Sequence, residues 1–149
     1  LFPLLLYLNE SDVIAVGDER LLLLKGKQKP TLEKEIAFEQ ELQSVYSCET
    51  GFALVFRDLE GEGQYKVKIY NNSGELKLEH KIGFEFTDLL LDSKKAIIYN
   101  EANVLVLGLN GVEKYNGDLG GNIQVLIPTD TNDKVLAVYR DEIKLIKLR

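Results

Sequence analysis

Short apolar or alternating runs, separated by polar turn signals, follow one another along almost the whole chain. In Tyr65–Tyr70 apolar residues alternate with lysines, which predicts a strand with one buried and one solvated face. Phe52–Phe56 and Val135–Tyr139 are apolar at every position, which indicates interior strands covered on both faces. Runs of this length with turn residues between them are typical of an all-β fold.

Two segments fit this pattern less clearly. Thr31–Leu42 fits a short helix, but Leu32, Ile36 and Phe38 fit a strand followed by a loop equally well, and both readings stay open. Leu1–Leu8 is apolar, but it is too short to span a membrane and lacks the basic flank of a signal peptide. We expect it to form a buried strand, with any anchor or signal lying upstream of it.

The stretch Phe52–Asp58 (FALVFRD) recurs along the chain. Its other copies are Val13–Glu19 (VIAVGDE), Lys95–Glu101 (KAIIYNE) and Val135–Asp141 (VLAVYRD). Their fifth positions are 39, 43 and 40 residues apart and are occupied by Gly17, Phe56, Tyr99 and Tyr139. A period near 40 residues indicates an array of repeated structural units.

Each complete repeat is predicted to hold four short strands, and the last repeat three. The predicted strands are Phe2–Leu8, Val13–Val16, Leu21–Lys25, Leu32–Phe38, Gln43–Cys48, Phe52–Arg57, Tyr65–Tyr70, Leu76–Ile82, Phe86–Leu91, Ala96–Tyr99, Val104–Leu107, Val112–Tyr115, Ile123–Ile127, Val135–Tyr139 and Ile143–Leu148. Ser-Gly and Asn-Gly pairs stand where tight hairpins need residues that tolerate positive φ. Four-stranded units of this period with doubly buried inner strands are the blades of a β-propeller.

The segment Leu54–Gly74, with an apolar strand, a polar–acid turn, the run VKIY and the turn NNSG, resembles blades of the WD and PQQ types. The chain has no Trp, so the tryptophan marks of both types are absent. The whole chain resembles the C-terminal part of membrane-anchored propeller proteins of unknown function from Gram-positive bacteria. That resemblance implies an extracytoplasmic location with an anchor upstream, and it supplies no catalytic residue.

Residues 1–149 are expected to form one domain, with three complete blades and a fourth that lacks its outermost strand. Three arrangements are compatible with this count: a small ring closed within the chain, half of a larger propeller, or one ring shared by two copies. We favour the larger propeller, because a chain that opens in an apolar strand and contains no Met resembles a piece of something longer. Open blade edges would also allow self-association.

The net charge of −6 argues against nucleic-acid binding, which requires a basic face for the phosphates. His80 is the single histidine and Cys48 the single cysteine, so neither has the partners that a metal site or a nucleophile–base pair requires. Pro128–Asp133 has alternating oxygen side chains but does not match an EF-hand loop, and a polar hairpin loop is the simpler reading. Gly61 and Gly63 lack the helix and lysine of a phosphate loop. We therefore predict no cofactor, no metal and no catalytic residue.

A polar residue and an acid follow the repeated apolar run in every copy. Because the copies are aligned, these pairs are expected to lie at the same turn of each blade and to form a ring that includes Arg57, Asp58, Asn100, Glu101, Arg140 and Asp141, together with Asp18 and Glu19. The loops that join successive blades reach the same face, and they carry Phe38, Phe84, Phe86, Gly120 and Gly121. Phenylalanine beside charged residues is typical of protein-binding surfaces.

The sequence thus favours a non-enzymatic β-propeller module that binds a protein or peptide through Arg57, Asp58, Asn100, Glu101, Arg140, Asp141, Phe84 and Phe86. The alternative is a propeller that binds a ligand or calcium and has hydrolase-type activity at its central axis. In that case Asp58, Glu101 and Asp141 would be ligands or general acids. A structural spacer without a partner is a third possibility.

Overall fold

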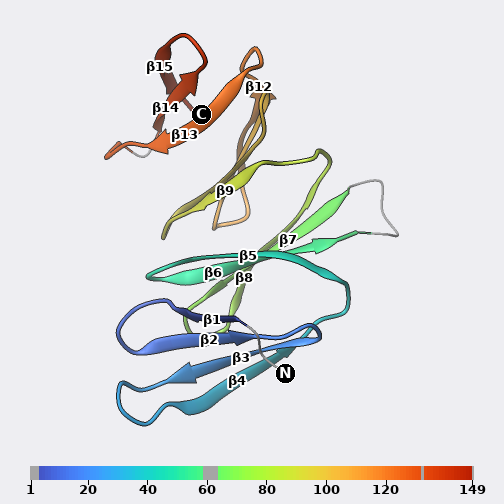
Figure 1. Cartoon of the computed structure of the whole chain (residues 1–149), viewed down its shortest axis with the longest axis vertical. Coiled ribbons are helices and arrows are strands. Elements are labelled where there is room, and N and C mark those ends of the chain that lie inside the picture. Colours follow the sequence, from blue (N-terminus) through green and yellow to red (C-terminus); the bar gives the residue numbers. More distant parts are fainter. Residues whose placement is uncertain (1–3, 59–63, 132, 149) are drawn as a thin grey trace. The chain divides into compact units, whose positions relative to one another are not determined.

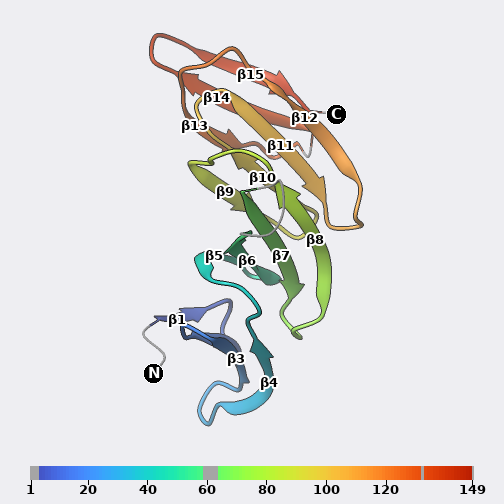
Figure 2. The same cartoon turned by 90° about the vertical axis from the view of Figure 1, so that its right-hand side faces the viewer.

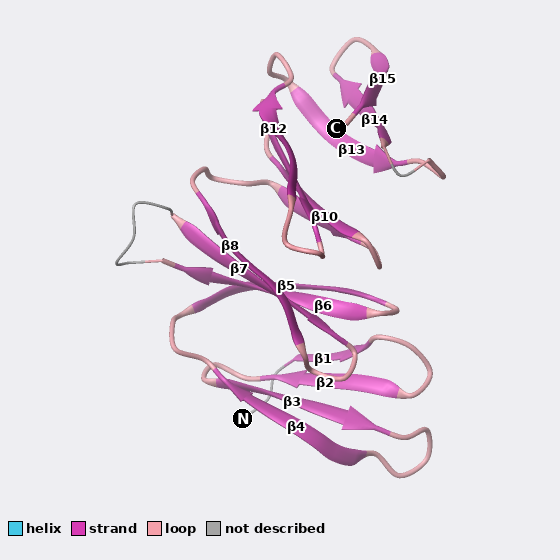
Figure 3. Ribbon diagram, turned by 180° about the vertical axis from the view of Figure 1, so that it is seen from behind, coloured by secondary structure: helices cyan, strands magenta, loops and turns pink. Residues whose placement is uncertain are grey.

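The computed structural model describes residues 4–58, 64–131 and 133–148, and the described part contains strands and turns but no helix (Figure 3). The segment that fitted either a helix or a strand is resolved in favour of the strand, which ends at Ala37. It is an outer strand and mostly exposed, which explains why its apolar residues gave no clear period. Fifteen strands are present in the described residues, as predicted.

The strands form four antiparallel sheets, which we call blades 1 to 4 (Figure 1). Each blade is built from consecutive strands, so neighbours in the chain are neighbours in the sheet. Blade 1 holds β1 (Leu4–Tyr7), β2 (Asp12–Val16), β3 (Arg20–Lys25) and β4 (Thr31–Ala37); blade 2 holds β5 (Leu42–Cys48), β6 (Gly51–Arg57), β7 (Tyr65–Asn71) and β8 (Leu76–Ile82); blade 3 holds β9 (Asp88–Leu91), β10 (Lys95–Tyr99), β11 (Asn103–Gly108) and β12 (Glu113–Asp118); blade 4 holds β13 (Ile123–Pro128), β14 (Lys134–Tyr139) and β15 (Ile143–Lys147). Four antiparallel sheets, the last with three strands, confirm the predicted propeller-blade architecture.

The innermost strand of blade 1 corrects one expectation. The apolar segment at the start of the chain was expected to form a buried strand. In β1, however, three of the four residues are exposed and the fourth is half-buried. The reason is that β1 pairs with β2 along one edge only, and one of its faces has no neighbouring sheet in the described residues of its unit.

The chain divides into two compact units. Unit 1 comprises residues 1–84 and 91–93 and contains blades 1 and 2, while unit 2 comprises residues 85–90 and 94–149 and contains the remaining blades.

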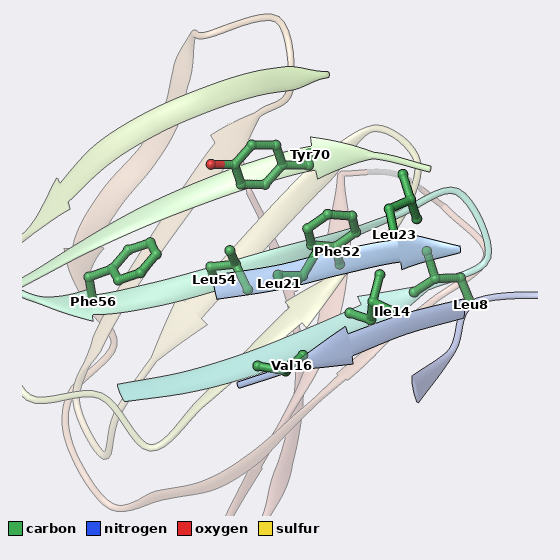
Figure 4. Packing of buried hydrophobic residues seen from close by; sticks show 9 residues of the cluster. All are labelled: Leu8, Ile14, Val16, Leu21, Leu23, Phe52, Leu54, Phe56 and Tyr70. Carbon is green, nitrogen blue, oxygen red and sulfur yellow. The ribbon is translucent and has the colours of Figure 1, made fainter. Parts of the chain in front are cut away.

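The core of unit 1 lies between its two blades (Figure 4). Ile14, Val16 and Leu21 of blade 1 pack against a face of blade 2 that carries Leu54 and Phe56. All five side chains are buried, which removes their apolar surface from water and stabilises the pairing of the blades.

Two aromatic residues of blade 2 close the same core. Phe52 stacks on Tyr70 with ring centroids 5.2 Å apart. Burial, reinforced by the nearby carboxylates of Glu79 and Glu39, raises the pKa of the Tyr70 hydroxyl above its ordinary value.

Unit 2 repeats this arrangement with blades 3 and 4 (Figure 2). Ile97 and Tyr99 of β10 pack against Leu126 and Ala137 of blade 4. Tyr99 is fully buried, and burial raises the pKa of its hydroxyl. In both units, therefore, the second strand of the leading blade faces the following blade.

Tyr99 does not occupy the position in the repeat that its sequence suggested. Phe56 and Tyr139 face the preceding blade, whereas Tyr99 faces the following one. The hydrogen bonds that close the hairpins explain the difference. In blade 1 the bond is donated by the N–H of Gly17, and in blade 3 the corresponding bond is donated by Asn100. Tyr99 therefore lies one residue earlier in its repeat than the sequence alignment placed it. Ala96–Tyr99 is apolar at every position, so its pattern could not distinguish one face from the other.

Candidate functional site

In blades 1, 3 and 4 the turn between the second and third strands lies at the same end of the blade as the loops that join successive blades. We call this the joint end. Backbone hydrogen bonds fasten loop to turn: Phe38 donates to Glu19 over 2.8 Å in unit 1, and Ile123 donates to Glu101 over 2.8 Å in unit 2. The predicted polar–acid pairs accordingly lie at or just after the end of the second strand in all four blades, with Arg57 as the last residue of β6.

In unit 1 the joint end contains an open cleft of about 530 Å³, which we call the first cleft. Its lining is almost entirely charged or polar, and the one apolar residue is the half-buried Phe38. The lining residues are Asp18, Glu19, Phe38, Glu39, Gln40, Glu41, Arg57 and Lys66. Four carboxylates against two cations give the first cleft a negative balance.

The aromatic floor of the first cleft is fixed by packing. Phe38 meets Phe56 edge to face, with centroids 5.4 Å apart. On the blade 2 side, the ammonium nitrogen of Lys68 lies 5.7 Å from the centre of the Phe56 ring. The loop from blade 1 therefore rests on an aromatic ring that is itself held within blade 2.

Arg57 and Asp58 are adjacent in sequence but lie in different environments. The Arg57 side chain is exposed, and its backbone N–H donates to the carbonyl oxygen of Glu41 over 2.9 Å. Asp58 is 8% exposed, and Gln40 Nε2 lies 3.5 Å from its Oδ1 as a long donor. Asp58, which was predicted to be exposed, is therefore buried, whereas Arg57 is exposed as predicted.

In unit 2 the loop between blades 3 and 4 borders a second cleft of about 620 Å³. It is lined by Leu119, Gly120, Gly121, Asn122, Tyr139, Arg140, Asp141, Glu142 and Lys144. The loop turns back sharply because Gly120, Gly121 and Asn122 all have positive φ, at 94°, 84° and 65°. Two acids face two cations here, so the second cleft is balanced in charge.

The second cleft reproduces the packing of the first cleft. The Tyr139 hydroxyl donates to the carbonyl oxygen of Leu119 over 3.0 Å, and the Lys144 ammonium nitrogen lies 5.4 Å from the Tyr139 ring centre. Lys144 also forms an ion pair of 3.0 Å with Glu142, whose hydrogen bond raises the pKa of the lysine.

Strand register shows that these residues are structural equivalents. Leu42 pairs with Phe56 as Ile123 pairs with Tyr139, and both pairs precede the same bulge. Lys68 pairs with Leu54, and Lys144 pairs with the corresponding residue of blade 4. The lysine over an aromatic ring, beside a blade-joining loop, is therefore a repeated feature.

A third, shallower cleft of about 370 Å³ lies in unit 2, where the chain enters blade 3. It is lined by Glu85, Phe86, Thr87, Asn100, Glu101, Ala102 and Asn103. The Asn100 side chain donates to the carbonyl oxygen of Glu85 over 2.7 Å and accepts from the backbone of Ala102 and Asn103. Asn100 therefore builds the turn, and Glu101 is the exposed member of its pair.

The structure brings most of the predicted residues to clefts, though not to a single one. Arg57 lines the first cleft, Arg140 and Asp141 the second, and Phe86, Asn100 and Glu101 the third. Asp58 and Phe84 line none of the three.

Sequence reasoning missed several lining residues. In the first two clefts these are Glu39, Gln40, Glu41, Lys66, Leu119, Asn122, Tyr139, Glu142 and Lys144. The acidic loop 39–41 could have been identified from the sequence, because it is a run of charged and polar residues between two predicted strands. The two lysines could not, because they alternate with apolar residues as on any half-buried strand.

The other candidate chemistry is not assembled within the described residues. They contain no group of three or more His, Cys, Asp or Glu side chains that could hold a metal ion. Glu101 and Asp141, ligands in the alternative function, line different clefts. In the described part of this segment, Thr129 Oγ1 donates to the carbonyl oxygen of Lys134 over 2.8 Å, while Asn132, Gly61 and Gly63 lie outside the described residues.

The two single residues singled out in the sequence lie on strands. His80 is half-buried on β8, and the sulfur of Cys48 lies 3.4 Å from the hydroxyl of Thr50. No helix among the described residues is long and apolar enough to cross a membrane.

Solved structures with a similar fold include natural and designed proteins. The computationally designed Ika4 protein matches with a TM-score of 0.63 at 10% identity, over 97% of this chain and 89% of Ika4. BBS1N, solved in complex with ARL6DN, matches with a TM-score of 0.58 at 12% identity, over 93% of this chain and 47% of BBS1N. Hsv2 of Kluyveromyces lactis matches with a TM-score of 0.55 at 10% identity, over 94% of this chain and 43% of Hsv2. The chain thus spans a little under half the length of these two natural propeller proteins.

Identities this low show the fold alone. No curated protein matches the chain. A family model matches residues 1–148, and the chain belongs to that family, a family of unknown function (DUF5711).

Proposed function

We propose that this β-propeller module is a non-enzymatic binding protein that captures a protein or peptide at its joint end. The observation that carries the proposal is the recurrence of one arrangement in both units: a blade-joining loop, an aromatic ring beneath it, a lysine over the ring and an open charged cleft. An aromatic platform surrounded by charge suits protein recognition, where aromatic residues and arginine supply most of the binding energy.

The first cleft is the better candidate for the principal contact. Its acidic balance suits a segment with lysine or arginine, Phe38 suits an apolar neighbour of that segment, and Arg57 suits a carboxylate beside it. One solved relative in fold, BBS1N, is described in complex with a protein, ARL6DN, which supports a protein partner for a fold of this kind.

The proposal is tested with a random peptide library displayed on phage, selected against the immobilised 149-residue chain. The affinities of selected peptides are then measured for the wild type, Arg57→Glu, Glu39→Lys and Arg140→Glu. We expect at least one of the two variants in the first cleft to weaken binding about tenfold or more, because a charge on the peptide that loses its partner in the interface costs about 2–5 kcal/mol. Arg140→Glu reports whether the second cleft takes part.

The matched control is Lys29→Glu, an exposed cation in the loop between β3 and β4, at the opposite end of blade 1. It changes the net charge by the same amount as Arg57→Glu and should leave the affinity unchanged. Peptides that bind Arg57→Glu, Glu39→Lys and Arg140→Glu like the wild type would show that the joint end is not the binding surface.

We also propose that the protein works outside the cytoplasm. Support comes from the resemblance to membrane-anchored propellers of Gram-positive bacteria. An epitope tag placed in the full-length protein of the source organism should be degraded when protease is added to intact cells. A protected tag would place the domain in the cytoplasm.

A further inference from the structure

The loop that joins blades 3 and 4 borders the second cleft with bare backbone. Gly120, Gly121 and Asn122 all line this cleft, and all three have positive φ. A Cβ atom at Gly120 or Gly121 would meet nothing within 4 Å, so glycine is favoured there by the backbone conformation and not by lack of space. Glycines in such a loop allow a ligand to approach the peptide groups closely.

One N–H group of this loop already binds a carboxylate. The N–H of Gly120 donates to Oδ1 of Asp118 over 2.7 Å. The N–H groups of Gly121 and Asn122 donate to no residue in the part of the chain that the structure describes. Successive N–H groups in a turn form a concave site for an anion, and two such donors match the two oxygens of one carboxylate.

Arg140 supplies a positive charge to the same cleft. Lys144, the other cation there, is paired with Glu142 at 3.0 Å, whereas the Arg140 guanidinium group forms no ion pair within the described residues. The hydrogen bond from the Tyr139 hydroxyl to Leu119 fastens the strand end before Arg140 to the loop. A guanidinium group binds a carboxylate through two parallel hydrogen bonds, so Arg140 suits the same ligand as the loop.

We propose that the second cleft binds one carboxylate group of the partner, between the N–H groups of Gly121 and Asn122 and the guanidinium group of Arg140. This inference rests on the proposed function, because it names the chemical group by which the partner is held in this cleft. The carboxylate at the C-terminus of a peptide and the one on an aspartate or glutamate side chain share this chemistry.

The acids around the second cleft restrict the charge of the ligand. Asp141 and Glu142 line the cleft, and Asp118 contacts its loop. A phosphate group carries more negative charge than a carboxylate and is repelled more strongly by these three acids. A carboxylate has a single charge, and the directed N–H donors can bind it although the cleft has no excess of cations.

The test is a titration of the isotope-labelled 149-residue chain, followed through its amide NMR signals at neutral pH and constant ionic strength. Acetyl-glycyl-glycine presents a C-terminal carboxylate, and acetyl-glutamate with its α-carboxyl group amidated presents a side-chain carboxylate. At least one of them should shift the signals of Gly121 and Asn122 to saturation, which identifies the source of the carboxylate. Acetyl-glycyl-glycine amide, which has no carboxylate, should leave both signals in place.

The absence of a saturable shift with both carboxylate compounds would overturn the inference, and so would inorganic phosphate that binds equally tightly. These outcomes are separate from those of the peptide selection. Selected peptides that lose affinity in the joint-end variants uphold the proposed function even where the carboxylate compounds fail to bind. Saturable shifts uphold the carboxylate site even where no selected peptide depends on the joint end.

Two substitutions with opposite expected effects distinguish direct binding from a structural role. Arg140→Gln should raise the dissociation constant of the carboxylate compound about tenfold, because a charge-assisted pair is lost. Asp141→Asn should lower it about threefold, because a like charge is removed from the cleft. A merely structural effect would weaken binding in both variants.

The matched control is Lys29→Gln, which removes an exposed cation from unit 1 and should leave the dissociation constant unchanged. Signals away from the second cleft show in the same spectra whether each variant keeps its fold. Where Arg140→Gln disturbs them, Arg140→Lys replaces it. That variant keeps the charge but loses the paired hydrogen bonds, so its affinity should fall between those of the wild type and Arg140→Gln. An unchanged affinity in the folded variant would overturn the role of Arg140.

Discussion

The Tyr139 hydroxyl donates a hydrogen bond of 3.0 Å to the carbonyl oxygen of Leu119, and this bond ties blade 4 to the loop that leaves blade 3. The equivalent position in blade 2 is Phe56, which holds its loop by ring contact with Phe38 instead. The loop between blades 1 and 2 and the loop between blades 3 and 4 are thus held at equivalent positions, one by an apolar contact and the other by a polar contact.

Removing the hydroxyl should weaken the joint in unit 2. Tyr139→Phe keeps the ring under Lys144 and loses only the hydrogen bond, so the free energy of unfolding should fall by about 1 kcal/mol. Chemical denaturation measures the difference. Tyr7→Phe removes a hydroxyl from a residue that is 73% exposed and should change the free energy of unfolding little.

Gly51 begins β6 at a point where the backbone of β7 approaches closely. A Cβ atom there would overlap the backbone oxygen of Tyr70, and neither strand can move without breaking register. Gly51→Ala should therefore lower the free energy of unfolding by about 2 kcal/mol, the typical effect of overpacking. Gly83→Ala is the matched control, because a Cβ atom at Gly83 meets nothing within 4 Å. Equal losses for the two variants would contradict the steric explanation.

Asp12 is a buried acid on β2, and it is anchored twice. Lys25 Nζ lies 3.1 Å from its Oδ1, and Asn9 Nδ2 donates to its Oδ2 over 2.8 Å. Asp12→Ala should cost about 2 kcal/mol, because both charge-assisted bonds are lost and Lys25 keeps a partly buried charge.

A second ion pair, at the neighbouring turn, provides the comparison. Glu10 and Lys27 are 2.8 Å apart, but both side chains are mostly exposed. Glu10→Ala should therefore change the free energy of unfolding by no more than about 0.5 kcal/mol. A loss as large as that of Asp12→Ala would show that burial does not determine the contribution.

Alkaline pH should destabilise the protein through Tyr99 and Tyr70. Burial raises the pKa of both hydroxyls above the ordinary value of 10.0. A raised folded-state pKa means that the folded state holds its proton more tightly than the unfolded state. The stabilising contribution is therefore complete below about pH 10 and is lost as the pH rises through the folded-state values.

Tyr99→Phe separates the contribution of unit 2. Melting temperatures of the wild type and the variant, measured from neutral pH to beyond pH 10, should show a shallower decline for the variant. Ultraviolet absorbance of the phenolate, followed in parallel, reports when tyrosine ionises. Identical declines would exclude Tyr99 as a source of the pH dependence.

A thermal melt with added calcium distinguishes the proposed protein-binding module from the alternative, a propeller that binds calcium. Since the described residues hold no cluster of three or more metal-ligating side chains, micromolar calcium should leave the melting temperature unchanged. An increase of several degrees would favour the calcium-binding propeller instead.

Local pattern was sufficient to predict the strands. Alternation in Tyr65–Tyr70 and the uniformly apolar Val135–Tyr139 both fall on strands that the structure contains. These signals come from neighbours in the chain, and here every sheet is built from neighbours in the chain.

Contacts between blades were not predictable in the same way. Nothing near Tyr99 in the sequence shows that it faces blade 4, and nothing near Lys68 shows that it lies over Phe56. Asp58 was expected to be exposed like Arg57, and its burial depends on a loop from another blade that supplies Gln40. Clefts at the joint end arise from such long-range packing. The sequence predicted which turns and loops share that end of the blades, but it predicted no cleft.

The consecutive order of strands within every sheet has a consequence for the history of such a chain. No strand crosses over another to reach its partner, so a segment of about 40 residues can be duplicated or deleted at a joint without rethreading the rest. Whole blades are therefore the units by which such a chain can be lengthened or shortened, and relatives of different length are expected to differ by whole blades.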